Sequence, residues 1–176
     1  MKNLNLDDLA EGTLGLTPAL GKTKAEAASH CLEIQGHKPG VQMDASDKQY
    51  PSYTLTWSDV TEQIRKSWSD IQEAVEEGAV GIAILLVKDL TGLQVIERAR
   101  KGTGFDYWLG DQAASLFQQA GRLEASGILS ENDKNNLAIR MKIKSAQVSI
   151  SDSLRIPAYV VVVSFGQPGF AFAVIQ

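Results

Sequence analysis

The chain has 176 residues, of which 44% are hydrophobic and 22% are charged, values typical of a folded globular protein rather than a disordered one. Its formal net charge of −4 excludes a protein coated in basic residues, although it is compatible with a local basic groove. A single cysteine, Cys31, excludes an internal disulfide and a cysteine-based metal cluster. The N-terminal stretch lacks the apolar segment of a signal peptide, and the longest apolar run, Ala79 to Val87, is too short to cross a bilayer. We therefore expect a soluble, cytoplasmic protein without a membrane partner, and the sequence does not indicate its oligomeric state.

The N-terminal third predicts an arm followed by a small β element. Met1 to Gly21 shows no clear period, which indicates a loosely packed lead-in. Lys22 to His30 is rich in alanine and favours a short helix. Cys31 to Ile34 alternates like a strand and could form a hairpin with Val41 to Asp44 across the turn-like G-H-K-P-G segment. Tyr53 to Trp57 alternates cleanly and is enriched in β-forming residues, so it predicts a strand.

Two helices are predicted next. Ser58 is a suitable N-cap for an amphipathic helix that ends near Gly78. Its apolar face recurs at helical spacing, in Val60, Ile64, Trp68, Ile71 and Val75. Ala79 to Arg100 is compatible with a buried strand at its start, but its continuation favours a second helix. The stripe that favours it consists of Leu86, Leu90, Leu93 and Glu97. On this interpretation Glu97 lies in line with the apolar stripe.

Two strands carrying acidic residues are predicted to follow. Phe105 to Leu109 is aromatic and apolar except for Asp106. A second strand is predicted within Leu116 to Leu129. Because strand side chains alternate between faces, Arg122, Glu124 and Ser126 share one face of that strand.

The C-terminal part predicts a helix and two further strands. Ser130 is a suitable N-cap for a helix that reaches about Gln147. Its exposed positions are basic, namely Lys134, Arg140, Lys142 and Lys144. Ala158 to Phe165 and Phe170 to Ile175 then predict a strand pair, the first apolar on both faces as at the covered centre of a sheet.

The expected fold is therefore α/β or α+β, with a mixed sheet flanked by helices. We expect residues 1–57 to form an N-terminal arm and small β element packed on a main domain of residues 58–176. From Leu86 onward the predicted order is helix, strand, strand, helix, strand, strand. Acids lie near the end of the first helix and in the first and second strands.

This order and these acids resemble the restriction-endonuclease-like, or PD-(D/E)XK, phosphodiesterase fold. The resemblance covers roughly the C-terminal half and implies Mg²⁺ or Mn²⁺ as cofactor, with Glu97, Asp106 and Glu124 as metal ligands. Asp106 takes the aspartate place in G-F-D-Y-W-L and Glu124 the glutamate place in R-L-E-A-S-G. The blocks G-T-G-F-D-Y-W-L-G and R-L-E-A-S-G-I also resemble those of uncharacterised bacterial proteins, which implies no function.

One position departs from the family pattern. Ser126 stands two residues after Glu124, where the family has a catalytic lysine, and a serine cannot supply positive charge. The family sometimes moves this lysine to the following helix, where Lys142, Lys144 and Arg140 are candidates that periodicity does not separate. Arg122, on the same strand face, is an alternative partner that would neutralise Glu124 structurally.

The resemblance leaves two functions open. One is a metal-dependent nuclease, or a degenerate relative that binds DNA or RNA. Its candidate catalytic residues are Glu97, Asp106, Glu124, Ser126, Lys142 and Lys144. In it the nucleic acid would contact Lys134, Arg140, Lys142 and Lys144. The other is a non-enzymatic interaction protein that serves as an accessory subunit of a larger protein complex.

Overall fold

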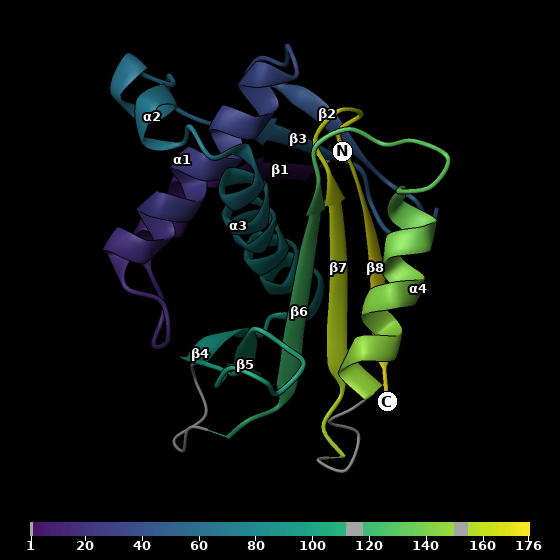
Figure 1. The fold of residues 1–176 in the computed structure, drawn as a ribbon. Coiled ribbons are helices and arrows are strands. Elements are labelled where there is room, and N and C mark those ends of the chain that lie inside the picture. Colours follow the sequence, from purple (N-terminus) through teal and green to yellow (C-terminus); the bar gives the residue numbers. More distant parts are fainter. Residues whose placement is uncertain (1, 112–117, 150–154) are drawn as a thin grey trace.

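The computed structural model describes residues 2–111, 118–149 and 155–176, which form a mixed sheet with helices on both faces (Figure 1). The expected class, α+β with a mixed sheet flanked by helices, is confirmed. In chain order the elements are β1 (Lys2–Asn5), the 3-10 helix η1 (Leu6–Glu11), α1 (Pro18–Ile34), β2 (Val41–Ala45), β3 (Tyr53–Thr56), α2 (Glu62–Ser67), α3 (Ile71–Thr91), β4 (Gln94–Arg98), β5 (Tyr107–Gly110), β6 (Gly121–Ile128), α4 (Leu137–Val148), β7 (Ala158–Ser164) and β8 (Gly169–Ile175).

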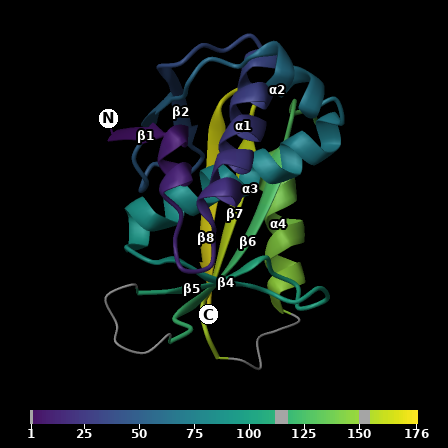
Figure 2. The same ribbon diagram turned by 90° about the vertical axis from the view of Figure 1, so that its left-hand side faces the viewer.

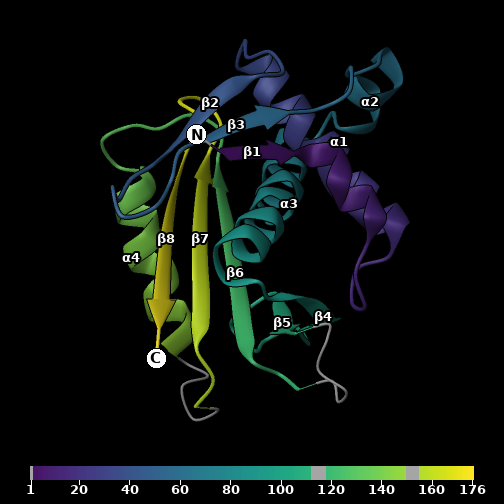
Figure 3. The same ribbon diagram turned by 180° about the vertical axis from the view of Figure 1, so that it is seen from behind.

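The described strands form an eight-stranded sheet in the order β1-β3-β2-β8-β7-β6-β5-β4. The pairs β1–β3, β2–β8 and β6–β7 are parallel, and the other neighbours are antiparallel. The long strands β6, β7 and β8 form the centre, with β1 to β3 crossing one end and β4 and β5 at the other end (Figures 1 and 3). The predicted strands at Tyr53 to Trp57 and in the C-terminal pair are confirmed as β3, β7 and β8.

Helices cover both faces of the central strands. Helix α3 packs on β6 and β7 with α1 beside it, whereas α4 packs on the opposite face against β6, β7 and β8 (Figure 2). Side chains of β7 pack on both faces of the sheet. Val161 and Val163 belong to the large core under α1 and α3, whereas Val160 and Val162 belong to the smaller clusters under α4. The prediction that this strand is apolar on both faces because it is covered on both is therefore confirmed.

The predicted hairpin between Cys31–Ile34 and Val41–Asp44 is wrong, because Cys31 to Ile34 is the last turn of α1. This helix begins earlier than expected, at Pro18, where the Thr17 hydroxyl accepts a hydrogen bond from the Leu20 N–H. The adjacent Cys31 and Leu32 are both buried, which is possible because α1 packs against α3, η1 and α2. Strand β2 pairs instead with β3 and, through Asp44 and Ala45, with β8.

The helix predicted from Ser58 to Gly78 is interrupted in the structure. Thr61, not Ser58, caps the short α2, and Asp70 then starts a new helix by accepting hydrogen bonds from the N–H groups of Gln72 and Glu73. Helix α3 therefore crosses the predicted boundary at Gly78 and continues to Thr91.

The helix predicted to reach Arg100 ends nine residues earlier, at Thr91. Gly92 follows in the left-handed conformation (φ 78°), and its N–H donates to the Lys88 carbonyl, a common way for a helix to end. The chain then forms β4, an additional strand relative to the expected order, so Glu97 lies on a strand instead of a helix. Helix α4 also begins later than predicted, because Asn136 and not Ser130 is its N-cap.

Residues 2–57 contribute three strands to the same sheet and the helices η1 and α1 to the same core. Leu4, Leu6, Met43 and Leu55 from this segment are buried in one cluster with Ile82 of α3. The strand predicted within Leu116 to Leu129 is observed as β6, and residues 116 and 117 lie outside the described residues. In the described part of the chain, no helix combines the length and apolarity needed to span a membrane.

The contact between α1 and α3 depends on a glycine. A Cβ atom added at Gly78 would lie 2.8 Å from the backbone N and Cα atoms of Ala28, closer than real Cβ atoms approach such atoms. The two helix backbones can therefore lie at their observed spacing only if residue 78 has no side chain.

We expect Gly78→Ala to lower the free energy of unfolding by about 1–3 kcal/mol, because overpacking costs more than the roughly 1 kcal/mol that alanine gains inside a helix. Urea denaturation followed by circular dichroism measures this change. The control Glu76→Ala, at an exposed position two residues away, is expected to change stability by less than about 0.5 kcal/mol. A Gly78→Ala variant as stable as the parent would contradict the close approach.

Candidate functional site at the open edge of strand β6

Strand β6 loses one of its two neighbours halfway along its length. Strand β5 pairs with it only from Tyr107↔Leu123 to Leu109↔Gly121. Just before β5, the Asp106 N–H donates to the Leu123 carbonyl (2.7 Å), and Asp106 Oδ2 accepts from the Ala125 N–H (2.9 Å). The carboxylate thus takes the place that a backbone carbonyl would have if β5 continued beside β6.

A cavity of about 880 Å³ lies where β5 leaves β6. Its walls come from α1, α3, α4, the segment between β4 and β5, and the residues Glu124 to Gly127 of β6. The charged side chains that line it are Lys24, Glu76, Glu77, Arg98, Arg100, Lys101, Asp106, Glu124, Arg140 and Lys144. An otherwise acidic chain therefore places six cationic and four acidic side chains around one cavity, counted over the described residues.

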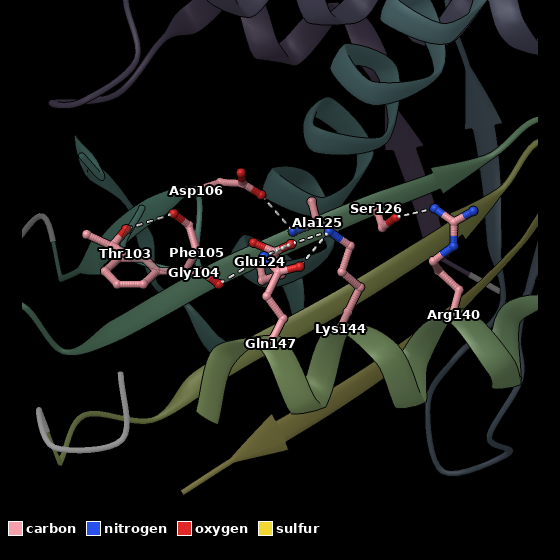
Figure 4. A network of polar contacts seen from close by, with 10 residues as sticks. All are labelled: Thr103, Gly104, Phe105, Asp106, Glu124, Ala125, Ser126, Arg140, Lys144 and Gln147. Atoms are coloured by element: carbon pink, nitrogen blue, oxygen red, sulfur yellow. Dashed lines mark hydrogen bonds and ion pairs between the residues drawn. The ribbon is translucent and has the colours of Figure 1, made fainter. Parts of the chain in front are cut away.

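Glu124 is the buried acid of this cavity, with 3% of its surface exposed. Its Oε1 atom accepts hydrogen bonds from Lys144 Nζ (2.7 Å) and Gln147 Nε2 (3.1 Å), both on α4 (Figure 4). Lys144 and Gln147 are three residues apart and so share one face of the helix. Gln147 also donates to the Gly104 carbonyl (3.3 Å), which ties α4 to the segment that carries Asp106.

The two carboxyl groups influence each other. Burial, followed by the nearby charge of Asp106, raises the pKa of Glu124 from 4.5 to about 7, although Lys144 opposes the shift. Burial also raises the pKa of Asp106, against the Ala125 N–H and the charges of Lys144, Lys24 and Arg98. Glu124 can therefore gain or lose a proton near neutral pH, a property that suits proton transfer or cation binding.

The remaining residues of the predicted β6 face also meet α4. Arg140 Nη1 donates to Ser126 Oγ (3.1 Å), so a guanidinium group reaches the position where the family pattern has lysine (Figure 4). Arg122 instead donates to the carbonyls of Ile156 (2.9 Å) and Val148 (3.2 Å). Glu124 forms its ion pair with Lys144 and not with Arg122. The alternative in which Arg122 neutralises Glu124 is therefore wrong.

The structure brings together Asp106, Glu124, Ser126, Arg140 and Lys144, all of which line the cavity. Of the two candidate lysines on α4, Lys144 forms an ion pair with Glu124, whereas Lys142 is exposed and outside the cavity lining.

Three predicted site residues lie elsewhere. Glu97 is exposed on β4 and does not line the cavity, because the helix expected to carry it has already ended. Lys134 is exposed before α4 and, like Lys142, is outside the cavity lining.

Sequence reasoning missed Gln147 and the charged cavity-lining residues Lys24, Glu76, Glu77, Arg98, Arg100 and Lys101. Gln147 had a usable signal, since it follows Lys144 by three residues on a predicted helix. Lys24 and Glu77 had none: they belong to α1 and α3 and reach the cavity only through tertiary packing.

The expected three-carboxylate metal site is not assembled. Within the described residues, no group of three or more histidine, cysteine, aspartate or glutamate side chains could hold a metal ion. Asp106 and Glu124 nevertheless each keep one carboxylate oxygen without a hydrogen-bond partner in this part of the chain. Hard oxygen donors of this number fit Mg²⁺, which commonly uses one or two carboxylates and keeps several waters.

No protein-family model, curated protein or solved structure matches this chain. The interpretation of the cavity therefore depends on its geometry and charges.

Glu124→Gln tests the raised pKa of Glu124 through its effect on stability. Between pH 4.5 and about 7 the folded state keeps a proton that the unfolded state has lost, so the wild-type carboxyl disfavours folding progressively as pH rises. Glutamine lacks this charge and can still accept hydrogen bonds from Lys144 and Gln147. We expect Glu124→Gln to gain stability relative to wild type from pH 5 to pH 8, by an amount on the order of 1–3 kcal/mol.

Urea denaturation at both pH values in EDTA measures this gain. Glu73→Gln, at an exposed position of α3, is the control and is expected to show the same pH dependence as wild type. Equal stability differences between Glu124→Gln and wild type at the two pH values would show that the Glu124 pKa is not raised.

Proposed function

We propose that the chain is a metal-dependent phosphodiesterase of the PD-(D/E)XK type that acts on nucleic acid. The observation that carries the proposal is the meeting of Asp106, Glu124 and Lys144 in a cavity whose other charged side chains are mainly cationic. Asp106 immediately precedes β5, Glu124 lies on the next strand, β6, and the lysine lies on the following helix, which is close to the arrangement that the sequence resemblance implies when the lysine has moved.

The charge distribution supports an anionic substrate. The chain as a whole has a net charge of −4, yet among the described residues cationic side chains outnumber acidic ones six to four around the cavity. Arg98, Arg100 and Lys101 lie together at the end of β4 and in the segment after it, on the rim of the cavity beside Asp106. A phosphodiester backbone is the anionic polymer that such a cluster suits.

Each residue of the pair has a role that its contacts suggest. The Ala125 N–H orients Asp106 through Oδ2, and Lys144 and Gln147 orient Glu124 through Oε1. Each acid keeps its second oxygen without a hydrogen-bond partner among the described residues, so the two could hold one cation, Mg²⁺ or Mn²⁺, which when present would supply Lewis-acid activation of water and of the phosphate group. Lys144, beside Glu124, is placed to stabilise negative charge that develops on the phosphate.

A second candidate is a non-catalytic subunit that binds nucleic acid or protein. It is favoured by the ion pair between Lys144 and Glu124, which neutralises a carboxylate that a cation would otherwise occupy. The lack of a third acidic ligand among the described residues points the same way.

Mutation of the acids and of Lys144 tests the phosphodiesterase. With Mg²⁺ or Mn²⁺, we expect wild type to cleave single- or double-stranded DNA or RNA, and Asp106→Ala, Glu124→Ala and Lys144→Ala to reduce kcat by roughly 10²–10⁴-fold. Lys142→Ala is the matched control, because this lysine is exposed on the same helix and outside the cavity lining, and it is expected to keep wild-type activity.

Isothermal titration with Mn²⁺ measures cation binding in the same variants and separates the two candidates. Cleavage undiminished in both acid variants would identify a contaminating nuclease. Nucleic-acid binding without cleavage or cation binding would contradict the phosphodiesterase and support the non-catalytic subunit.

A further inference from the structure

A second lysine, Lys24 of α1, reaches the cavity from the side opposite to Lys144. Only 2% of its surface is exposed, and it lines the cavity together with Glu77 and Asp106. Its Nζ atom forms an ion pair with Glu77 Oε2 and lies 5.9 Å from the centre of the Tyr107 ring. Removing an ammonium group from water is costly, so a lysine in this position requires an anionic partner at all times.

The position of Lys24 follows from the close packing of α1 on α3. Gly81 of α3 lies against it, and a Cβ atom at Gly81 would be 3.0 Å from the Lys24 Cβ. The lack of a side chain at residue 81 lets the lysine extend past α3 toward the edge of β6. A residue of the N-terminal segment thereby enters a cavity that is otherwise built from residues 72–147.

The two members of this ion pair differ in their access to water. The Lys24 side chain is 3% exposed, whereas the Glu77 side chain is 32% exposed. If the pair separates, Glu77 can be solvated with little rearrangement, but Lys24 cannot. The ammonium group also has three N–H donors, and Glu77 is its only hydrogen-bond partner in the described chain. Lys24 can therefore exchange its anionic partner, provided that another anion enters the cavity.

We propose that Lys24 is a phosphate-binding residue of this cavity, and that Glu77 is its partner in the free protein, which a phosphate group of the nucleic acid displaces. The inference rests on the proposed function only for the class of substrate, and it requires neither a metal ion nor catalysis. The groups that face Lys24 from neighbouring elements are Glu77 on α3 and Asp106 and Tyr107 at the start of β5, and Arg98 at the end of β4 lines the same cavity. An incoming phosphate would contact Lys24 from this cavity.

Competition between Glu77 and phosphate gives a distinctive expectation. The probe is a fluorescein-labelled single-stranded oligodeoxynucleotide of 12 residues, titrated with the protein in EDTA and followed by fluorescence anisotropy. We expect Lys24→Met to weaken binding roughly tenfold and Lys24→Arg to retain it within about threefold. Glu77→Gln is expected to tighten binding severalfold, because it removes the charge that competes with phosphate while keeping a hydrogen-bond acceptor.

Salt dependence provides a second readout. For single-stranded nucleic acid, each protein charge that neutralises a phosphate contributes about 0.7 to the slope of log K against log salt concentration. Lys24→Met is expected to reduce this slope by about that amount. The matched control is Lys22→Met, since Lys22 is exposed on the same helix and outside the cavity lining, and its variant is expected to bind as wild type does.

The direction of the Glu77→Gln effect decides the inference even if Lys24→Met fails to fold, which circular dichroism would reveal. Unchanged or weaker binding in Glu77→Gln would overturn the proposal, as would wild-type protein that does not bind the oligonucleotide. An equal gain in Glu76→Gln, at an exposed acid that lines the same cavity, would also overturn it, because it would show a general effect of charge and not the release of Lys24. Binding that depends on Lys24 without cleavage in Mg²⁺ would support this inference and count against the phosphodiesterase. Cleavage with an unchanged KM in a folded Lys24→Met variant would overturn this inference alone.

Discussion

The site depends on the place where β5 separates from β6. Strand β6 is paired with β7 along seven consecutive residues, from Arg122 to Ile128, but with β5 only along three. Beyond Leu123 the open edge still presents backbone hydrogen-bonding groups, and a buried N–H without a partner would be costly. Asp106 satisfies the first of these groups, that of Ala125, with its side chain. The same residue thus ends the pairing of the two strands and places a carboxylate beside Glu124.

The buried charge of Glu124 determines what surrounds it. A carboxylate with 3% exposure must be neutralised or hydrogen-bonded, and α4 supplies both with Lys144 and Gln147 on one face. Because Gln147 also binds the Gly104 carbonyl, the helix, the strand and the segment before Asp106 are coupled through one side chain. The negative charges of Asp106 and Glu124 nevertheless repel each other. Binding of a cation or a proton would relieve this repulsion.

The parts of the site that the sequence predicted are those that depend on local periodicity. Strand parity placed Arg122, Glu124 and Ser126 on one face of β6, and all three do meet α4. The prediction for Glu97 was wrong because an apolar stripe continued in register past the point where Gly92, with its left-handed conformation, ends α3. Of the stripe residues after that point, Leu93 precedes β4 and Glu97 lies within it, and periodicity over so few residues does not distinguish a helix from a strand. Likewise, Asp70 restarts a helix inside a stripe that appeared continuous.

The position of Lys24 in the cavity could not be predicted from local periodicity. It lies 100 residues before Glu124 in the sequence, in the segment that was expected to form an arm and a small β element packed on the main domain. Nothing in its alanine-rich surroundings indicates a buried cation, since its burial is produced by glycines of α3 that let α1 approach closely. A lysine with only 2% of its surface exposed, beside a more exposed glutamate, is costly to keep if its only purpose is to hold two helices together, because apolar side chains would do so with less desolvation. That cost is more readily explained if the ammonium group serves an anion that enters the cavity.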